Sequence, residues 1–187
     1  MSDSIPPLPD EYHRCPSCPL HYVSLSIADA TAVIAAMPAD AAAAVAAVDP
    51  ATLRVRSEPG TWSVIEYVCH LRDVAMTTTV RLHRARTEDR PALEPMLNDL
   101  RARRFRYADA DPQATLAELG RVVGGVSDEI ARISGDDWAR TVTRLPGEER
   151  TVCWLVRHAA HECRHHLADI ARVGRGDQRR GAAAAPP

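Results

Sequence analysis

The stretch that decides the fold is VCWLVRHAAHECRHHLADIARVG, residues 152–174 of the 187-residue chain. Its apolar residues recur every three or four positions, which is the period of an amphipathic α-helix. The apolar stripe consists of Val152, Leu155, Ala159, Cys163, Leu167 and Ile170. Gly174 is expected to end the helix, because glycine is the residue that favours helix C-termini. The stretch predicts a long helix with one apolar face and several histidines.

Three other stretches have the same helical period. They are residues 26–50, 61–87 and 111–134. Pro38 is expected to kink or divide the first, because proline lacks the backbone N–H of a helix interior. Thr61 or Ser63 can cap the second. Residues 88–111 form a long connection that contains a short helix. We therefore predict an all-α protein, an antiparallel four-helix bundle with one long crossover connection.

The size of the chain indicates one domain. Within it we expect an N-terminal extension at 1–24, a metal-binding bundle at 25–173 and a disordered tail at 174–187. The net charge is −2, which gives no electrostatic reason to expect nucleic acid or an anionic membrane as a partner. The basic run RARRFRY, residues 101–107, is interpreted as a solvated loop or a lid.

The compartment follows from the same kind of argument. The N-terminus has no charged-then-apolar signal peptide, and no apolar run approaches the ~20 residues of a membrane span. These features predict a cytoplasmic protein with no membrane partner. Its five cysteines are then expected to be reduced thiols.

The final helix contains the H-E-x-x-H motif of zinc metalloproteases, formed by His161, Glu162 and His165. Two histidines four positions apart leave the same face of a helix and can bind one metal ion. In a protease Glu162 would be the general base. That function also needs the usual downstream ligand and a substrate-binding strand, and neither is apparent. The protease interpretation is therefore disfavoured.

The second helix offers a third ligand. Glu66, His70, Asp73 and Thr77 form a polar line at spacings of four, three and four residues. Such a line either faces solvent or lines a site. Three imidazoles with an open coordination position are typical of catalytic metal sites. The alternative is that each histidine is merely structural or exposed.

Two segments resemble a known family. GTWSVIEYVCHLRDV, residues 60–74, resembles the W-S-x-x-E-x-x-x-H-L segment of the DinB/YfiT-like bundle proteins. Residues 138–170 resemble their second signature, a tryptophan followed by a final helix with H-x-x-x-H. The resemblance covers residues 26–173. It implies a four-helix bundle with a divalent metal held by three histidines. The matching ligands are His70, His161 and His165.

The resemblance also implies a chemistry. The family includes thiol-dependent transferases and maleylpyruvate isomerase, so we expect a thiol to be transferred to an electrophilic small molecule through a metal-bound thiolate. Zinc is the expected metal, with nickel, iron or cobalt as alternatives. Glu66, Asp73 and Glu162 are candidates for acid–base catalysis. All basic residues are arginine, as in high-GC genomes such as those of actinobacteria, which makes mycothiol the candidate thiol.

Other functions stay open at this point. The chain could be a non-catalytic, stress-related metal-binding bundle, or a specialised biosynthetic isomerase or hydrolase that uses the same metal. The expected partners are a small-molecule substrate and a thiol, and a homodimer is a further option. His158 could replace His161 as a ligand. His166 points about 100° away from His165 around the helix and is interpreted as a packing or interface residue.

The N-terminal sequence YHRCPSCPLHY, residues 12–22, contains a second cluster. Cys15 and Cys18 have the spacing of half a zinc knuckle, and His13 or His21 could complete a structural zinc site. A cluster without metal and a redox or ligand-contacting pair are the alternatives. The remaining cysteines are expected to pack in the core. They are Cys69, Cys153 and Cys163.

Overall fold

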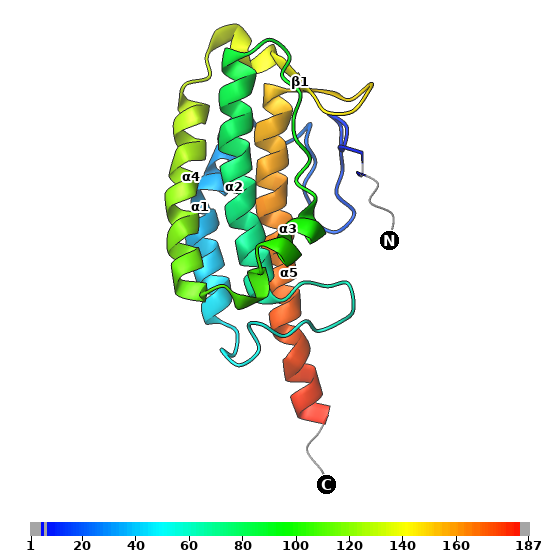
Figure 1. Ribbon diagram of the computed structural model, residues 1–187, viewed down its shortest axis with the longest axis vertical. Coiled ribbons are helices and arrows are strands. Elements are labelled where there is room, and N and C mark those ends of the chain that lie inside the picture. Colours follow the sequence, from blue (N-terminus) through cyan, green and yellow to red (C-terminus); the bar gives the residue numbers. More distant parts are fainter. Residues whose placement is uncertain (1–4, 6, 184–187) are drawn as a thin grey trace.

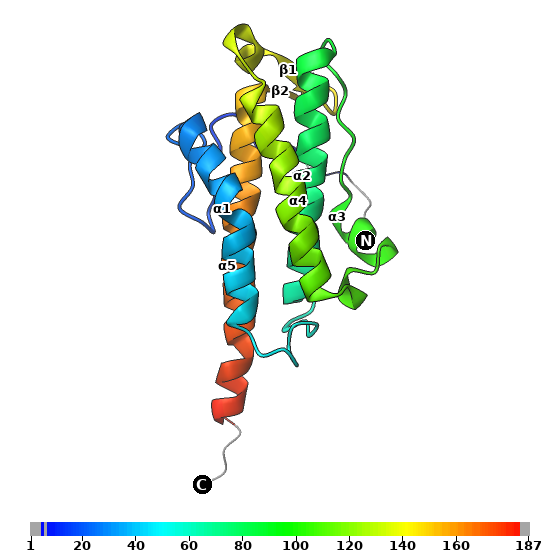
Figure 2. The same ribbon diagram turned by 90° about the vertical axis from the view of Figure 1, so that its left-hand side faces the viewer.

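The computed structural model is a bundle of four long helices (Figures 1 and 2). It describes residue 5 and residues 7–183, with side chains up to residue 175. The long helices are α1 (Ile27–Ala46), α2 (Val64–Thr87), α4 (Pro112–Ala131) and α5 (Val152–Ala183). In Figure 1, α1 and α5 run downward and α2 and α4 run upward. The predicted all-α bundle is confirmed.

The connections explain this arrangement. After α2, the segment 88–111 returns along the bundle and carries α3 (Asn98–Arg104) and a short 3₁₀ helix, η1 (Tyr107–Asp109). This is the long crossover that the sequence predicts, and it makes α2 and α4 parallel. A second 3₁₀ helix, η2 (Gly135–Ala139), and the antiparallel hairpin β1 (Thr141–Thr143) and β2 (Glu149–Thr151) link α4 to α5.

Helix ends follow local chemistry. Ser63 caps α2 in a capping box with Glu66, one of the two caps that the sequence offered. Pro38 lies inside α1 without ending it.

Gly174 does not end α5, which continues to Ala183. A Cβ at Gly174 would lie 2.4 Å from Val48 Cγ2, so this glycine allows the close approach of two segments. Of the tail predicted to be disordered, residues 184–187 lie outside the described part.

The core consists of aliphatic side chains from all four long helices, with Trp154, Tyr22 and Tyr107 as its largest fully buried members. Helix α1 is long and apolar enough to cross a membrane by length and composition alone. Such helices also occur as core helices of bundles, and α1 turns Ile34 and Met37 into the core, each 1% exposed.

The N-terminal segment lies along α5 on the right of Figure 1. Its backbone is held at the start of that helix, where the Trp154 indole N–H donates to the Asp10 carbonyl at 3.2 Å and Arg150 donates to the Leu8 and Pro9 carbonyls. Tyr22 is fully buried. The segment is therefore part of the folded domain and covers one face of α5.

Candidate metal centre

Helix α5 presents two pairs of ligand-type side chains, each with a spacing of four residues. One pair is Glu162 and His166, and the other is His161 and His165. Adjacent helix positions differ by about 100°, so the two pairs point to different sides of the helix. The first meets α2, and the second meets the N-terminal segment. Each forms a set of groups that could hold a metal ion.

The first set consists of His70, Glu162 and His166 and is called the bundle site below. His70 comes from α2 and is 1% exposed. Its Nε2 lies 3.3 Å from Glu162 Oε2, and His166 Nε2 lies 3.4 Å from the same oxygen. The rings of His70 and His166 meet edge to face, with centroids 4.6 Å apart. Two facing helices therefore bring three donor atoms together.

The distances in the bundle site fit a divalent cation. Zinc binds histidine nitrogen and carboxylate oxygen at about 2.0–2.2 Å, so two such ligands of a tetrahedral ion lie roughly 3.3–3.5 Å apart. The two nitrogen–oxygen distances of 3.3 and 3.4 Å match this edge. All three donor atoms lie within 4.8 Å of one another. The residues present can thus hold the metal that the family resemblance implies.

Asp169 orients His166. His166 Nδ1 lies 3.1 Å from Asp169 Oδ2, and Arg172 donates to the other oxygen of the carboxylate at 2.9 Å. A carboxylate behind a histidine fixes the ring and its tautomer, which leaves Nε2 to face Glu162 and His70. This is the usual arrangement around histidines that bind metals.

The pKa values of the bundle site reflect its charge balance. Burial alone would lower the pKa of His166, but hydrogen bonds with Asp169 and Glu162 outweigh it and raise the pKa to about 9. Burial would raise the pKa of Glu162, yet the hydrogen bonds with His166 and His70 hold it well below its usual range. Burial lowers the pKa of His70, which favours the neutral imidazole that a metal needs.

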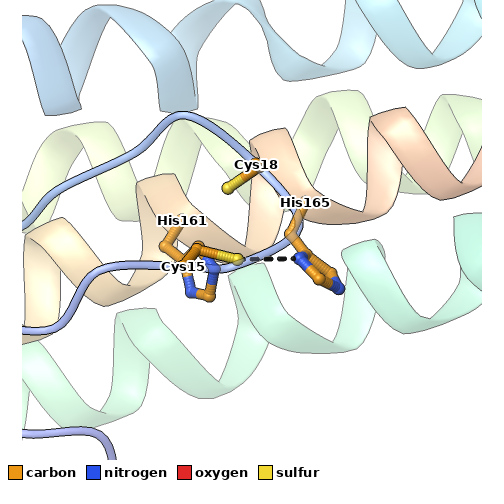
Figure 3. A group of neighbouring side chains, drawn as sticks. All are labelled: Cys15, Cys18, His161 and His165. Carbon is orange, nitrogen blue, oxygen red and sulfur yellow. Dashed lines mark hydrogen bonds between the residues drawn. The ribbon is translucent and has the colours of Figure 1, made fainter.

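The second set consists of Cys15, Cys18, His161 and His165 and is called the N-terminal site below. Figure 3 shows the two cysteines on the N-terminal segment facing the two histidines on α5. Cys15 Sγ lies 3.4 Å from His165 Nδ1. His13 and His21, which the sequence suggested as partners of the cysteines, are not part of this set.

The sequence predicted a metal held by His70, His161 and His165. In the described part of the chain, the sets of neighbouring ligand atoms place His70 with Glu162 and His166, and place His161 and His165 with the cysteines. No described set contains all three histidines, and their joint binding of one ion stays a prediction. Glu162 and His166 have the same i,i+4 spacing as His161 and His165, so the sequence did contain the signal for the bundle site.

Glu66 and Asp73, the other predicted acid–base groups, have partners of their own. Glu66 accepts hydrogen bonds from the Ser63 backbone and hydroxyl at 2.9 and 2.8 Å and pairs with Arg56. Asp73 accepts a 2.6 Å hydrogen bond from the Tyr107 hydroxyl. Arg72 and Arg101 complete its surroundings. Both carboxylates therefore stabilise helix and crossover contacts, and an acid–base role for them stays a prediction.

His158 lies one helical turn before the two sets. It stacks on Trp154 with ring centroids 4.5 Å apart, and its Nδ1 lies 2.8 Å from the Tyr22 hydroxyl. It also forms a possible ligand group with His161 and Glu162. The stacking and the hydrogen bond make His158 a half-buried support for the site.

The fold and the site together define a class: a four-helix bundle with candidate metal ligands on facing helices. A family model described as the DinB superfamily matches residues 33–170. The chain therefore belongs to the DinB superfamily, as its sequence motifs indicated. No curated protein sequence matches the chain.

Two similar solved structures support the fold. One is YfiT from Bacillus subtilis, described as a probable metal-dependent hydrolase with an unusual four-helix bundle topology. It is 24% identical with a TM-score of 0.72, and the match covers 83% of this chain and 87% of YfiT. The other is a mycothiol-dependent maleylpyruvate isomerase, 16% identical with a TM-score of 0.63. That match covers 79% of this chain and 62% of the isomerase.

Proposed function

We propose that the chain is a divalent-metal-dependent enzyme that transfers a low-molecular-weight thiol to an electrophilic small molecule, with the metal at the bundle site. The observation that carries the proposal is the convergence of His70, Glu162 and His166 at distances that fit one cation. Three protein ligands leave a coordination position free for a substrate, as in catalytic metal sites. A cation held there would lower the pKa of a bound thiol, so that it ionises at neutral pH.

A catalytic metal site also needs ligands held in fixed positions and access for a small molecule, and the side chains around the bundle site provide both. His70 is buried and fixed in position by the edge of Trp62, whose ring centroid lies 5.0 Å away. Glu162 and His166 keep 18% and 16% of their side chains exposed, so a small molecule can reach them. Asp169 holds the ring of His166. The chain thus combines a rigid set of ligands with a partly open side.

An arginine further along α2 favours a substrate that carries an anionic group. Arg81 on α2 is half-buried, and its buried Nε has no hydrogen-bond partner among the described residues. One of its terminal nitrogens donates to the Glu94 carbonyl at 2.6 Å. Burial, followed by the charge of Arg144, lowers its pKa to about 10, and the charge of Glu162 opposes that shift. We infer that this cationic donor, about three helical turns beyond His70 on α2, meets a carboxylate at the far end of an extended substrate.

The choice of a thiol as co-substrate rests on two supports. A structure of the same fold belongs to a mycothiol-dependent isomerase. The chain's basic residues are all arginine, which is typical of proteins from organisms with high-GC genomes. Actinobacteria are such organisms, and mycothiol is their candidate thiol. A hydrolase that uses water at the same position is the second candidate, favoured by the description of YfiT as a probable hydrolase.

The test is an assay of the zinc-loaded, full-length protein with a thiol and an electrophile such as an epoxide or a haloarene. Mycothiol, glutathione and cysteine are compared, each with and without a carboxylate on the electrophile. We expect turnover that depends on the thiol and is lost in His70→Ala. Turnover without thiol would instead support hydrolysis. A metal-loaded protein that is inactive under all conditions would support a non-catalytic metal-binding bundle.

Arg81→Met separates substrate recognition from chemistry. We expect a higher KM for carboxylate-bearing electrophiles with a smaller change in kcat, because the arginine contacts the substrate away from the reacting atom. The KM for an uncharged electrophile is the control and should stay the same. An equal rise in KM for both substrates would show that Arg81 only supports the fold.

A further inference from the structure

We propose that Cys15, Cys18, His161 and His165 form a second, structural zinc site that fastens the N-terminal segment to α5. The proposal is independent of the function of the bundle site. The donors come from two segments far apart in the sequence: Cys15 and His165 are 150 residues apart, and Cys15 Sγ lies 3.4 Å from His165 Nδ1. Two cysteines and two histidines are a common ligand set of closed zinc sites.

The geometry fits a tetrahedral ion. Zinc binds cysteine sulfur at about 2.3 Å and histidine nitrogen at about 2.0 Å, so a sulfur–nitrogen edge of the tetrahedron is roughly 3.5 Å long. The distance between Cys15 Sγ and His165 Nδ1 is 3.4 Å. All four donor atoms lie within 4.8 Å of one another. In Figure 3 the cysteines and histidines lie around a common space between the segment and the helix.

His161 is prepared for this role by its surroundings. Its Nδ1 lies 3.2 Å from the Tyr22 hydroxyl, which in turn lies 2.8 Å from His158 Nδ1. If Tyr22 donates to His158, its oxygen accepts the Nδ1–H of His161, which leaves the lone pair of His161 on Nε2. That Nε2 is buried and has no hydrogen-bond partner among the described residues. A buried nitrogen of this kind is costly unless something binds it.

His165 has a matching support. Its Nδ1 faces Cys15, and its Nε2 lies 3.5 Å from Asp169 Oδ2. A carboxylate on the far nitrogen is the typical partner of a metal-binding histidine. Each histidine therefore has one nitrogen available for the metal and the other held by a protein oxygen. In His165 the available nitrogen is Nδ1, and in His161 it is Nε2.

The backbone holds the two cysteines in a tight turn. Arg14 and His21 form an antiparallel bridge, and the Cys15 N–H donates to the Leu20 carbonyl at 3.2 Å. Inside the turn the Ser17 N–H donates to Cys15 Sγ at 3.4 Å. This N–H holds the Cys15 sulfur in position inside the turn. Zinc binding would release the thiol protons of both cysteines to solvent.

The site has a structural consequence. Three protein ligands leave a position for substrate, whereas four protein ligands close the coordination sphere. A closed site would secure the segment that covers the histidine face of α5 next to the bundle site. Arg14 is exposed and directly precedes Cys15. Without the ion, the chain after Arg14 is expected to become accessible to trypsin.

The experiment uses full-length protein loaded with Co²⁺ in place of zinc. A cobalt–thiolate bond gives a charge-transfer absorption in the near ultraviolet, and the bundle site has no sulfur ligand to produce one. We expect this absorption in the wild type and in His70→Ala. It should disappear in the Cys15→Ser/Cys18→Ser double variant and weaken in His165→Ala. Trypsin should cut after Arg14 faster in the double variant than in the wild type.

Matched variants keep the test decisive. Cys153→Ser removes a cysteine outside the site and should leave the absorption intact, and helical circular dichroism shows whether each variant folds. Loss of the absorption in His70→Ala would mean one shared ion and would overturn the proposal. An absorption that survives in folded His161→Ala and His165→Ala but is lost in His13→Ala or His21→Ala would also overturn it, because the turn would then hold zinc alone. A wild type without the absorption would refute the site.

Discussion

The two sides of helix α5 differ in what they offer a metal. Toward α2 the helix gives one carboxylate and one imidazole, which meet His70. Toward the N-terminal segment it gives two imidazoles, which meet two thiols. The first set has three groups that could bind a metal and a partly exposed side, and the second has four such groups. Ligand number separates catalytic from structural zinc sites, so one helix can serve both purposes at neighbouring positions.

The largest expected difference between the two sites comes from removing adjacent histidines of α5 one at a time. His166→Ala removes a proposed ligand of the bundle site, and His165→Ala removes a proposed ligand of the N-terminal site. We expect His166→Ala to lower thiol-transfer activity by more than about 100-fold, since loss of a supporting residue alone typically costs 10–100-fold. His165→Ala should cost much less activity. Activity and metal content of both zinc-loaded variants are measured side by side, and the reverse order of effects would refute the assignment.

Glu162→Gln tests whether this residue is a ligand or a base. As a ligand its removal should lower the metal content of the bundle site together with the activity. As the general base of a protease it would leave the metal in place, with a rate loss of about 10²–10⁴-fold. Metal analysis after dialysis distinguishes the outcomes. A fully loaded but inactive variant that also fails to cleave a peptide substrate which the wild type cleaves would restore the protease interpretation.

The N-terminal site should affect stability more than catalysis. An ion present at 100 times its dissociation constant stabilises the folded state by about 2.7 kcal/mol. For a protein of this size, that corresponds to a fall in Tm of roughly 5–11 °C when the site is lost. We expect a fall of this order in Cys15→Ser/Cys18→Ser, measured by thermal unfolding in zinc. Cys153→Ser is the control. An unchanged Tm in the double variant would show that no stabilising ion binds there.

Asp169 contacts one histidine of the bundle site and one of the N-terminal site. Its carboxylate lies 3.1 Å from His166 Nδ1 and 3.5 Å from His165 Nε2. Asp169→Asn should reduce metal affinity by roughly 10–100-fold without removing a ligand. Competition with a chelator of known affinity measures the effect. Because Asp169 contacts His166 more closely, the loss should be larger at the bundle site, and a loss confined to the N-terminal site would contradict this order.

The smallest effect is expected at Glu66, which lies on α2 one helical turn before His70 and belongs to neither set. Burial would raise its pKa, but the hydrogen bonds with Arg56 and Ser63 lower it. A carboxyl with a lowered pKa stabilises the fold above its ordinary pKa of about 4.3 and loses that contribution as pH falls. Glu66→Gln should cost about 1 kcal/mol at neutral pH, the typical value of a helix cap.

Chemical unfolding of the wild type and Glu66→Gln at several pH values tests this prediction. The difference in unfolding free energy should be constant above pH 5 and shrink below the ordinary carboxyl pKa of about 4.3. Catalytic activity should change little. A large loss of activity with unchanged stability would instead support the predicted acid–base role of Glu66.

Much of the fold was predictable from the sequence because it depends on local chemistry. The four helices follow from apolar residues at helical spacing, and the start of α2 follows from Ser63 and Glu66. Two motifs at the correct separation indicated the DinB superfamily. Gly174 was misinterpreted, because a glycine that ends a helix and one that lets Val48 approach look the same in a sequence.

The candidate site was predictable only as far as residue type and spacing go. The stretch HECRHH contains two overlapping i,i+4 pairs, and the sequence cannot say which of them faces His70. Only the packing of α5 against α2 sets the rotation of the helix, and a difference of one residue, about 100°, exchanges one pair for the other. In the structure Glu162 and His166 face His70.

The sequence determined that Cys15 and Cys18 form a cluster of metal-ligand type, since their spacing is local. It could not determine their partners, because His161 and His165 lie near the other end of the chain, with Cys15 and His165 150 residues apart. They approach the cysteines only after the N-terminal segment packs on α5. Short-range periodicity fixes which side chains share a face. Tertiary packing decides which faces meet, because burial of the apolar core, and not the ligands, sets the orientation of each helix.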